Sequence, residues 1–390
     1  MSTDLDTGII TLPVSDRPLV SILIATRSQA KLLENCLKSL VRNIGDGIAY
    51  EIIIVFNAAT DEVKSLVRDR TCGSVVLESA ANLGVAGGYN RARTAARGEF
   101  LLLLHDDTEI EPGWLQALLE TLVENPAAGA VGSIQFFPDG TLQRAGSILW
   151  QNATTSTPWA DGTPDPRILT DLRPVDYVGT CSSIVRTTTW DAIGGMDDAI
   201  FPAYFVDVDL CMNIHRIGQT VLCDPRSRVK HHQGASSNNS FRGFMNNRNR
   251  AYFVEKWAAA LAGYEPAAPD DPTAIDRANR ITARRAADLT ASWKQHSPIP
   301  DPLTEIDSEV QERIHYRKEI NLLSDYQKFL ETNQIRIKEK LEKANANLKS
   351  ANEKIQQLKK RCAALKRQSQ KKNESPVTRL INRIRKMGRS

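Results

Sequence analysis

Two adjacent carboxylates follow an uninterrupted apolar run. Five apolar residues, Phe100 to Leu104, lead directly into His105, Asp106 and Asp107. An apolar run without alternation predicts a strand buried on both faces, and open α/β sheets bind ligands at the carboxyl ends of such strands. Two like charges side by side require a counter-charge, which a divalent cation carrying a phosphate-bearing substrate would supply. The alternative is that Asp106 and Asp107 only begin a surface loop and cap the helix after Pro112.

A second group of polar residues lies later in the chain. Asp207 and Asp209 are separated by one residue and precede apolar residues at helical spacing. They either act on a substrate or only complement the positive end of the helix dipole. His231 and His232 are adjacent in a segment rich in Gly, Ser and Asn, where they are either metal ligands or inert exposed side chains.

A glycine-rich turn, NLGVAGG from Asn82 to Gly88, precedes a predicted helix. Glycine lets the backbone approach a ligand closely, and the start of a helix favours anions. The turn is not the GxGxxG fingerprint of dinucleotide-binding proteins, because that fingerprint would follow the first strand, where ATRSQ stands instead. By itself it does not identify a ligand.

The elements that must position these residues alternate between strand and helix. Predicted strands cover residues 19–26, 50–56, 74–77 and 100–104. Amphipathic helical patterns separate them, such as RSQAKLLENCLKSLVRN and the segment that follows the candidate N-cap Thr60. This alternation predicts an α/β fold with a Rossmann-like, mostly parallel, doubly wound sheet.

Composition is that of an ordinary globular protein. The chain has 390 residues, 41% of them hydrophobic and 25% charged. It contains no apolar run near the roughly 18 residues of a membrane span. The N-terminus lacks the pattern of a signal peptide, and the six cysteines show no CxxC spacing. We therefore expect a cytoplasmic protein with reduced thiols and no zinc site.

Charge is distributed unevenly along the chain. Residues 331–390 hold 18 Lys and Arg against 5 Glu, a net +13, so the total of +4 leaves −9 on residues 1–330. A basic segment on an acidic domain predicts an anionic partner, either a membrane or a polyanion. The alternative is a solvated helix face.

A heptad pattern marks the C-terminal part. The a positions are Ile320, Gln327, Gln334, Leu341, Leu348, Ile355 and Cys362, and the d positions are Leu323, Leu330, Ile337, Ala344, Ala351, Leu358 and Leu365. Every d position is apolar, which predicts a coiled coil. A parallel self-pair would place Lys354 near Lys359 of the other chain, so an antiparallel pair or a different partner chain stays equally open.

The last segment, PVTRLINRIRKMGRS, carries an apolar stripe surrounded by Arg and Lys. This pattern is typical of a helix that binds a membrane surface, and the alternative is a disordered tail. The chain is thus expected to comprise an α/β domain (18–262), a helical, Pro-rich linker (263–304), a coiled coil (305–372) and a basic amphipathic tail (373–390).

In their order, the motifs of residues 18–257 resemble a family 2, GT-A-type glycosyltransferase, in particular the bacterial rhamnosyltransferases and galactofuranosyltransferases. VSILIATRSQAKLLENCLKSL and EIIIVFNAATDE are similar to the first two strands of the family, and NLGVAGGYNRA to its glycine-rich loop. LLLLHDDTEIEPGWL resembles its DxD-type metal site. GTCSSIVRTTTWDAIGGMDDAIFPAYFVDVDLCMNIHRIG resembles the acceptor-side region with the catalytic Asp, and RVKHHQGAS the late His loop.

The resemblance implies roles for individual residues. Asp207 matches the general base, while Asp107 and His231 match the ligands of a Mg²⁺ or Mn²⁺ ion. The residues implied on the side of the donor nucleotide are Thr26, Arg27, Asn57, Asn82, Gly87, Arg91 and Asp106. Those implied on the acceptor side are Asp209 and Trp190.

Three positions depart from the family pattern. Phe56 stands where the family usually has an Asp that contacts the base, so that Phe56 would stack on the base or Asn57 would hydrogen-bond to it. His105 replaces the first Asp or Asn of the metal motif, and Val206 replaces the Glu before the catalytic Asp. Asp107 and Asp207 are both present, which favours an active enzyme.

The implied reaction is an inverting transfer of a sugar, rhamnose first, to a hydroxyl of a cell-surface glycan precursor. The donor would be dTDP-rhamnose or a UDP-sugar, and a lipid-linked acceptor at the inner face of the cell membrane would suit the basic tail. The heptads predict a homo-oligomer or a partner chain, and no nucleic acid is expected. The alternatives are a nucleotidyltransferase and a catalytically silent scaffold that acts through its coiled coil.

Overall fold

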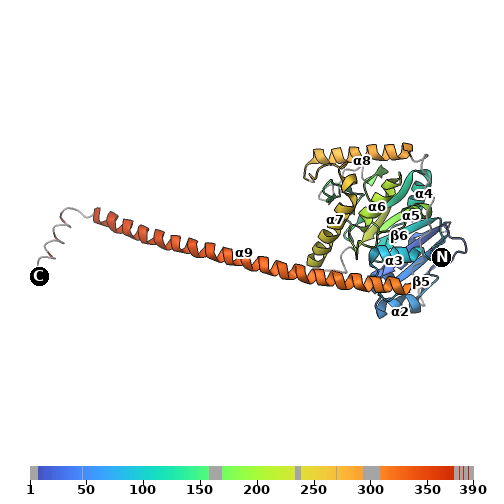
Figure 1. The fold of residues 1–390 in the computed structure, drawn as a ribbon, viewed down its shortest axis with the longest axis horizontal. Helices are drawn as coiled ribbons and strands as arrows, with labels where there is room; N and C mark the ends of the chain where they lie inside the picture. Colours follow the sequence, from blue (N-terminus) through green and yellow to red (C-terminus); the bar gives the residue numbers. More distant parts are fainter. Residues whose placement is uncertain are drawn as a thin grey trace. The chain divides into compact units, whose positions relative to one another are not determined.

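A computed structural model describes residues 8–45, 47–157, 169–232, 239–268, 270–292 and 308–372, with the single positions 377, 381 and 385 (Figure 1). The predicted basic tail lies outside the described residues except for those three positions. The chain divides into two compact units, Met1–Leu323 and Ser324–Ser390. The division into four segments expected from the sequence stays a prediction.

The strands are β1 (Ile10–Thr11), β2 (Val20–Thr26), β3 (Tyr50–Asn57), β4 (Thr71–Cys72), β5 (Val75–Ser79), β6 (Phe100–His105), β7 (Thr108–Ile110), β8 (Ala128–Phe136), β9 (Leu142–Arg144), β10 (Ile148–Leu149), β11 (Thr155–Ser156), β12 (Arg173–Pro174), β13 (Ser182–Arg186) and β14 (Thr220–His231). The helices are α1 (Ala30–Asn43), α2 (Asp61–Arg70), α3 (Gly84–Arg93), α4 (Trp114–Glu124), α5 (Thr187–Ile193), α6 (Val206–Arg216), α7 (Asn239–Leu261), α8 (Pro272–Ser292) and α9 (Ser308–Lys372).

The first unit is built on one mixed sheet. Its strands follow the order β12-β14-β8-β13-β6-β2-β3-β5, with β7 paired to β14 and β9 paired to β8. The β6-β2-β3-β5 part is parallel, as the alternation of strand and helix predicts. The other part is mixed, because β13 runs antiparallel between β6 and β8. The α/β class is confirmed.

Both faces of β2, β3 and β6 are buried, which explains their apolar runs, whereas β5 at the edge is largely exposed. In β3, Ile52 and Ile54 face a core shared with α1, α2 and α4, whereas Ile53 and Val55 face a second core shared with α3, α6 and α7. Successive side chains of a strand point to opposite faces, so a strand covered on both sides needs an apolar residue at every position.

Phe56 lies in the first of these cores and is 0% exposed. Its ring packs below α1 and α2, with the guanidinium carbon of Arg68 5.6 Å from the ring centroid. Stacking of Phe56 on a base, one of the two options expected from the sequence, is therefore wrong.

The second unit consists of the continuation of α9 beyond Leu323. Apolar side chains of the heptad positions, Leu330, Ile337, Leu341, Leu348, Ile355 and Leu358, are exposed along it. The long helix is present, and its pairing as a coiled coil stays a prediction. Among the described helices, none is both long and apolar enough to cross a membrane.

Truncating the centre of β6 tests the two-sided core. Leu102 is 0% exposed, so Leu102→Ala leaves a cavity and is expected to lower the free energy of unfolding by about 2–5 kcal/mol. Val123→Ala, at a side chain of α4 that is 55% exposed, is the control and should change stability by less than about 0.5 kcal/mol. Thermal unfolding of both variants measures this, and equal stabilities would contradict burial of β6.

Candidate functional site

The carboxyl end of β6 and the end of β14 meet through a short strand, β7. Its pairing sets His231 opposite Thr108, and the backbone N–H of His232 donates to the carbonyl of Asp107 at 3.0 Å. This register brings Nε2 of His231 to 3.2 Å from Oδ1 of Asp107. With His105, they form a group whose candidate ligand atoms all lie within 4.8 Å of one another.

This group of His105, Asp107 and His231, hereafter the His-Asp-His cluster, fits a metal ion chemically. Oδ1 of Asp107 is buried and accepts no hydrogen bond of good geometry from the described residues. Buried carboxylate oxygens normally have a partner, so this atom is suited to a cation. Two imidazoles and one carboxylate are donors that first-row transition metals prefer.

Charge within the cluster is strongly coupled. Burial and the nearby His231 lower the pKa of His105 to about 4, so that its imidazole is neutral at neutral pH. Burial opposes protonation of His231, but Cys181 and Asp107 outweigh it and raise the pKa of His231 to about 10. Burial would raise the pKa of Asp107, yet the two histidines hold it below its ordinary value. His231 is thus the cationic partner of the Asp107 carboxylate, and a metal ion bound at Nε2 of His231 would take the place of that proton.

Asp106 is joined to the neighbouring parallel strand. Oγ1 of Thr26, the last residue of β2, donates to Oδ2 of Asp106 at 2.7 Å. Burial raises the pKa of Asp106 to about 7, although the hydrogen bond from Thr26 opposes the shift. The two predicted donor-side residues therefore do lie together, at the carboxyl ends of β2 and β6.

Asp207 lies in the first turn of α6 and is linked to the His-Asp-His cluster through β9. Nη1 of Arg144 donates to Oδ2 of Asp207 at 3.1 Å. Oε1 of the preceding residue, Gln143, accepts a hydrogen bond from Nδ1 of His231 at 2.7 Å, and Nε2 of Gln143 donates to the His231 carbonyl at 3.2 Å. Asp207 and His231 are thus held by adjacent residues of one strand.

No sequence signal marked Gln143 and Arg144, because they lie in a stretch that looked irregular. The role of His105 was also missed. Read as a departure from the family pattern, it instead completes a three-residue cluster with Asp107 and His231. Its ring contacts Thr180, whose Oγ1 lies 3.3 Å from Nε2 of His105.

Other predicted donor-side residues hold the glycine-rich turn in place. Asn57 accepts a hydrogen bond from the N–H of Leu83 at 2.6 Å and donates to the carbonyl of Gly84 at 3.0 Å. Asn82 accepts from the N–H of Gly84 at 3.0 Å. Asn57 and Asn82 are both buried, and these hydrogen bonds of their amides shape the turn.

The remaining donor-side candidates lie around the same edge of the sheet. Gly87 sits in α3, where a Cβ would lie 2.9 Å from Cβ of Leu83. Arg27 follows β2 and keeps 54% of its side chain exposed. Arg91 is half-buried in α3.

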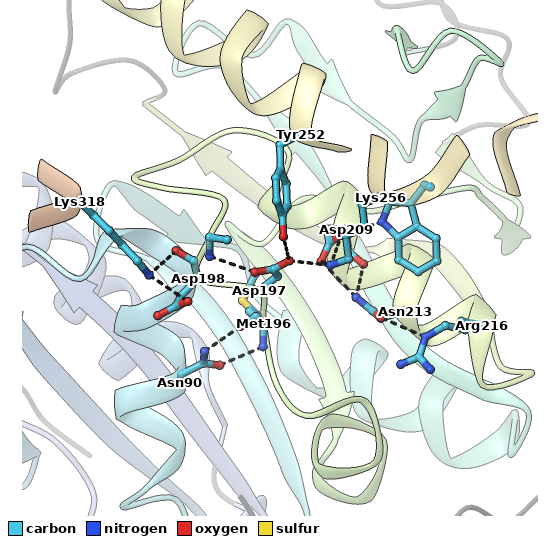
Figure 2. A network of polar contacts seen from close by, with 12 residues as sticks. Asn90, Met196, Asp197, Asp198, Asp209, Asn213, Arg216, Tyr252, Lys256 and Lys318 are labelled. Carbon is cyan, nitrogen blue, oxygen red and sulfur yellow. Dashed lines mark hydrogen bonds and ion pairs between the residues drawn. The ribbon is translucent and has the colours of Figure 1, made fainter. Parts of the chain in front are cut away.

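The two predicted acceptor-side residues are both buried. Asp209 is 1% exposed, and its carboxylate accepts hydrogen bonds from Trp257 at 2.7 Å and Lys256 at 2.9 Å (Figure 2). Trp190 is 0% exposed in the core on the α3 side of the sheet. Both side chains contact the surrounding framework, and their role on the acceptor side stays a prediction. Helical spacing did not reveal that Asp209 faces inward while Asp207 remains at the edge.

Residues 21–190 match the family model described as glycosyl transferase family 2. They form a family 2 glycosyltransferase domain. The predicted fold class, a GT-A-like α/β domain followed by helices, is confirmed with it. The nucleotidyltransferase alternative is excluded for this segment.

Curated relatives agree with this domain. The chain is 28% identical over 236 residues to O-antigen biosynthesis protein RfbC of Myxococcus xanthus, covering 57% of this chain and 18% of the relative. It is 26% identical over 246 residues to an N-acetylglucosaminyl-diphospho-decaprenol L-rhamnosyltransferase of Mycobacterium tuberculosis. The match covers 56% of this chain and 78% of that relative. An uncharacterized protein of Sinorhizobium fredii, y4gI, is 26% identical over 57% of this chain and 25% of its own length. The chain thus spans a quarter or less of two of these relatives.

Solved structures with a similar fold include GalNAc-T7 with UDP, GalNAc and Mn²⁺, at a TM-score of 0.49 and 14% identity over 64% of this chain and 50% of that chain. A second is the mannosyltransferase PcManGT from Pyrobaculum calidifontis with GDP-Man and Mn²⁺, at a TM-score of 0.46 and 18% identity. The match covers 75% of this chain and 80% of that chain.

Asp209→Asn tests the assignment of Asp209 to the framework. It removes the charge that a half-buried Lys256 faces, so the free energy of unfolding should fall by about 1–3 kcal/mol. Asp288→Asn, at an exposed position of α8, is the matched control and should leave the melting temperature unchanged. Wild-type stability of the Asp209 variant in thermal unfolding would show that the network contributes nothing.

Proposed function

We propose that this chain is a metal-dependent inverting glycosyltransferase that uses a nucleoside-diphosphate sugar. The observation that carries the proposal is the His-Asp-His cluster: His105 and Asp107 lie at the carboxyl end of β6, among the residues that match the family model, and His231 reaches them from the end of β14. Open α/β sheets bind ligands at this edge, and a diphosphate needs a cation there.

The ion would be held by Asp107, His231 and His105. Bound there, a divalent cation neutralises the negative charge that develops on the departing nucleoside diphosphate. Two imidazole ligands favour Mn²⁺ over Mg²⁺, because Mg²⁺ prefers oxygen ligands. His105 is neutral at neutral pH and so has a lone pair ready for a metal.

Asp207 is the proposed general base. It takes the proton of the acceptor hydroxyl while that oxygen bonds to the anomeric carbon and the bond from this carbon to the diphosphate oxygen breaks. Attack opposite the leaving group inverts the anomeric carbon in one step. Arg144 orients the Asp207 carboxylate through a contact of 3.1 Å. A general base of this kind contributes roughly 10²–10⁴-fold to the rate.

The donor and acceptor follow from the relative whose length the chain covers best. Its name specifies L-rhamnosyl transfer to a lipid-linked N-acetylglucosaminyl diphosphate. We therefore propose dTDP-rhamnose as donor, with a UDP-sugar second, and a glycan acceptor carried on a lipid. Contact of the basic tail with the inner membrane surface would bring the domain to such an acceptor.

The silent-scaffold alternative gains some weight from Phe56, which stands in place of a base-contacting Asp. Against it, Phe56 is a core residue packed with α1 and α2, so its ring does not obstruct a nucleotide. Both acids of the proposed chemistry, Asp107 and Asp207, lie at the edge of the sheet. Asp107 contacts His231, which is bonded to Gln143 of β9, and the next residue of β9, Arg144, is bonded to Asp207.

Two isosteric variants separate the proposed roles. Asp207→Asn should keep dTDP binding in Mn²⁺ but lose transfer by roughly 10²–10⁴-fold, because the amide cannot accept the proton. Asp107→Asn should lose the metal-dependent part of dTDP binding. Calorimetric titration of each variant with dTDP and UDP, with and without Mn²⁺, measures this. Equal and intact binding by both variants would refute the division of roles.

Removal of one imidazole tests the metal ligands directly. His105→Asn should weaken Mn²⁺ binding about tenfold or more while affecting Mg²⁺ less, because only the transition metal gains much from nitrogen. Mn²⁺ titration followed by electron paramagnetic resonance measures the affinity without any turnover. His232→Asn is the matched control, since His232 lies 3.0 Å from Glu109 and outside the cluster. Unchanged Mn²⁺ affinity in His105→Asn would remove His105 from the site.

A further inference from the structure

The first turns of α9 lie over the carboxyl edge of the parallel sheet. This segment, the α9 cover, is defined by Glu312, His315, Lys318, Glu319 and Leu322, all within the first compact unit. Its contacts reach residues that are far away in the sequence. They come from the ends of β2 and β5, from α3, and from the loop before α6.

Two carboxylates of the α9 cover point at groups that suit an anion. Oε1 of Glu319 lies 3.6 Å from Nη2 of Arg27, directly after β2. Oε1 of Glu312 accepts a hydrogen bond from the backbone N–H of Ala80, directly after β5, at 3.2 Å. A guanidinium and a backbone N–H at strand ends are also groups that bind phosphate.

The helix also closes over the glycine-rich turn. A Cβ added at Gly87 would lie 3.1 Å from Nε2 of His315, so the absence of a side chain there is what lets α9 approach. His315 is 4% exposed and its ring packs 6.3 Å from that of Phe201. The α9 cover thus contacts two of the proposed donor-side residues, Arg27 and Gly87.

One loop anchors the α9 cover. Asp198 pairs with Nε2 of His315 at 3.3 Å and with Nζ of Lys318 at 3.0 Å. Leu322 packs against Phe201 and Met245. Figure 2 shows Asp198 and Lys318 at one end of a polar network that continues through Asp197 to α7.

The same loop leads into α6 and Asp207. Its Pro202 carbonyl accepts the N–H of Val85 at 2.7 Å, and its Ala203 carbonyl accepts from Asn249 at 2.7 Å. Tyr204 and Phe205 both have positive φ, a conformation that the surrounding contacts must hold. The loop therefore couples α9, the glycine-rich turn and the proposed general base.

We propose that the α9 cover is a strap that competes with the donor nucleotide for Arg27 and must lift before the donor binds. This inference rests on the proposed function. The strand order β5-β3-β2-β6 reverses between β2 and β6, which puts the ligand crevice outside the carboxyl ends of these two strands, and Arg27 directly follows β2. Glu319 already neutralises that cation, so the diphosphate has to displace it.

The contacts between the α9 cover and the rest of the domain are weak enough to break and form again. Of the five residues of the α9 cover, only His315 and Leu322 are buried, and the ion pairs of Glu319 and Asp198 are partly exposed. Exposed ion pairs contribute little stability, and segments with few buried contacts open most easily. Since α9 continues as one helix to Lys372, whatever binds its distal part is able to influence the strap.

Loosening the strap should tighten donor binding. For full-length Glu319→Gln, calorimetry with dTDP and with UDP in Mn²⁺ is expected to give about tenfold tighter binding than wild type. The reason is that the wild-type affinity is reduced by the small fraction of open molecules. Leu322→Ala, which weakens the anchor without changing charge, should shift the affinity in the same direction. Glu342→Gln, the same substitution at an exposed position of α9, should have no effect.

Unchanged nucleotide binding by both Glu319→Gln and Leu322→Ala would overturn the proposed competition. Weaker binding by both would also overturn it and would mean that the α9 cover contributes contacts to the nucleotide. Tighter binding by Glu319→Gln alone would also overturn it, because the effect would then be one of charge only. Failure of the wild type and all variants to bind either nucleotide would instead overturn the proposed function.

Discussion

The pairing of β7 with the end of β14 is the constraint on which the site depends. It opposes Thr108 to His231, and a shift by one residue would turn the His231 side chain to the other face of the strand. Asp107 and His231 are distant in sequence, so no local interaction could bring them within 3.2 Å. The hydrogen bonds of one short strand fix the whole group of ligands.

The same edge of the sheet separates two acids that share a helix. Asp207 meets Arg144 and stays at the edge, whereas Asp209 turns inward to Lys256 and Trp257. Residues two apart on a helix point in directions about 200° apart, so one faces the site and the other the framework. Asp209 thus ties α6 to Lys256 and Trp257 of α7, and this connection holds Asp207 in its position.

The proposed donor-side residues and the proposed general base, Asp207, are connected through the loop from Met196 to Phe205 and through α9. The loop from Met196 to Phe205 accepts hydrogen bonds from the glycine-rich turn and from α7, and it is tied to α9 through Asp198. A movement of α9 would therefore reach the loop that precedes Asp207, the proposed general base. The same movement would change the ion pair between Glu319 of α9 and Arg27, which follows β2.

The sequence by itself determined the α/β class, the strands buried on both faces, the long helix near the C-terminus and the place of Asp107 at the end of a buried strand, because these follow from local periodicity. It could not determine that Phe56 and Asp209 face inward, that His105 joins the ligands, or that Gln143 and Arg144 connect them. Those assignments depend on which strands pair, on their register and on which helix covers which face. Only the tertiary structure decides such contacts, because they join residues separated by long stretches of chain.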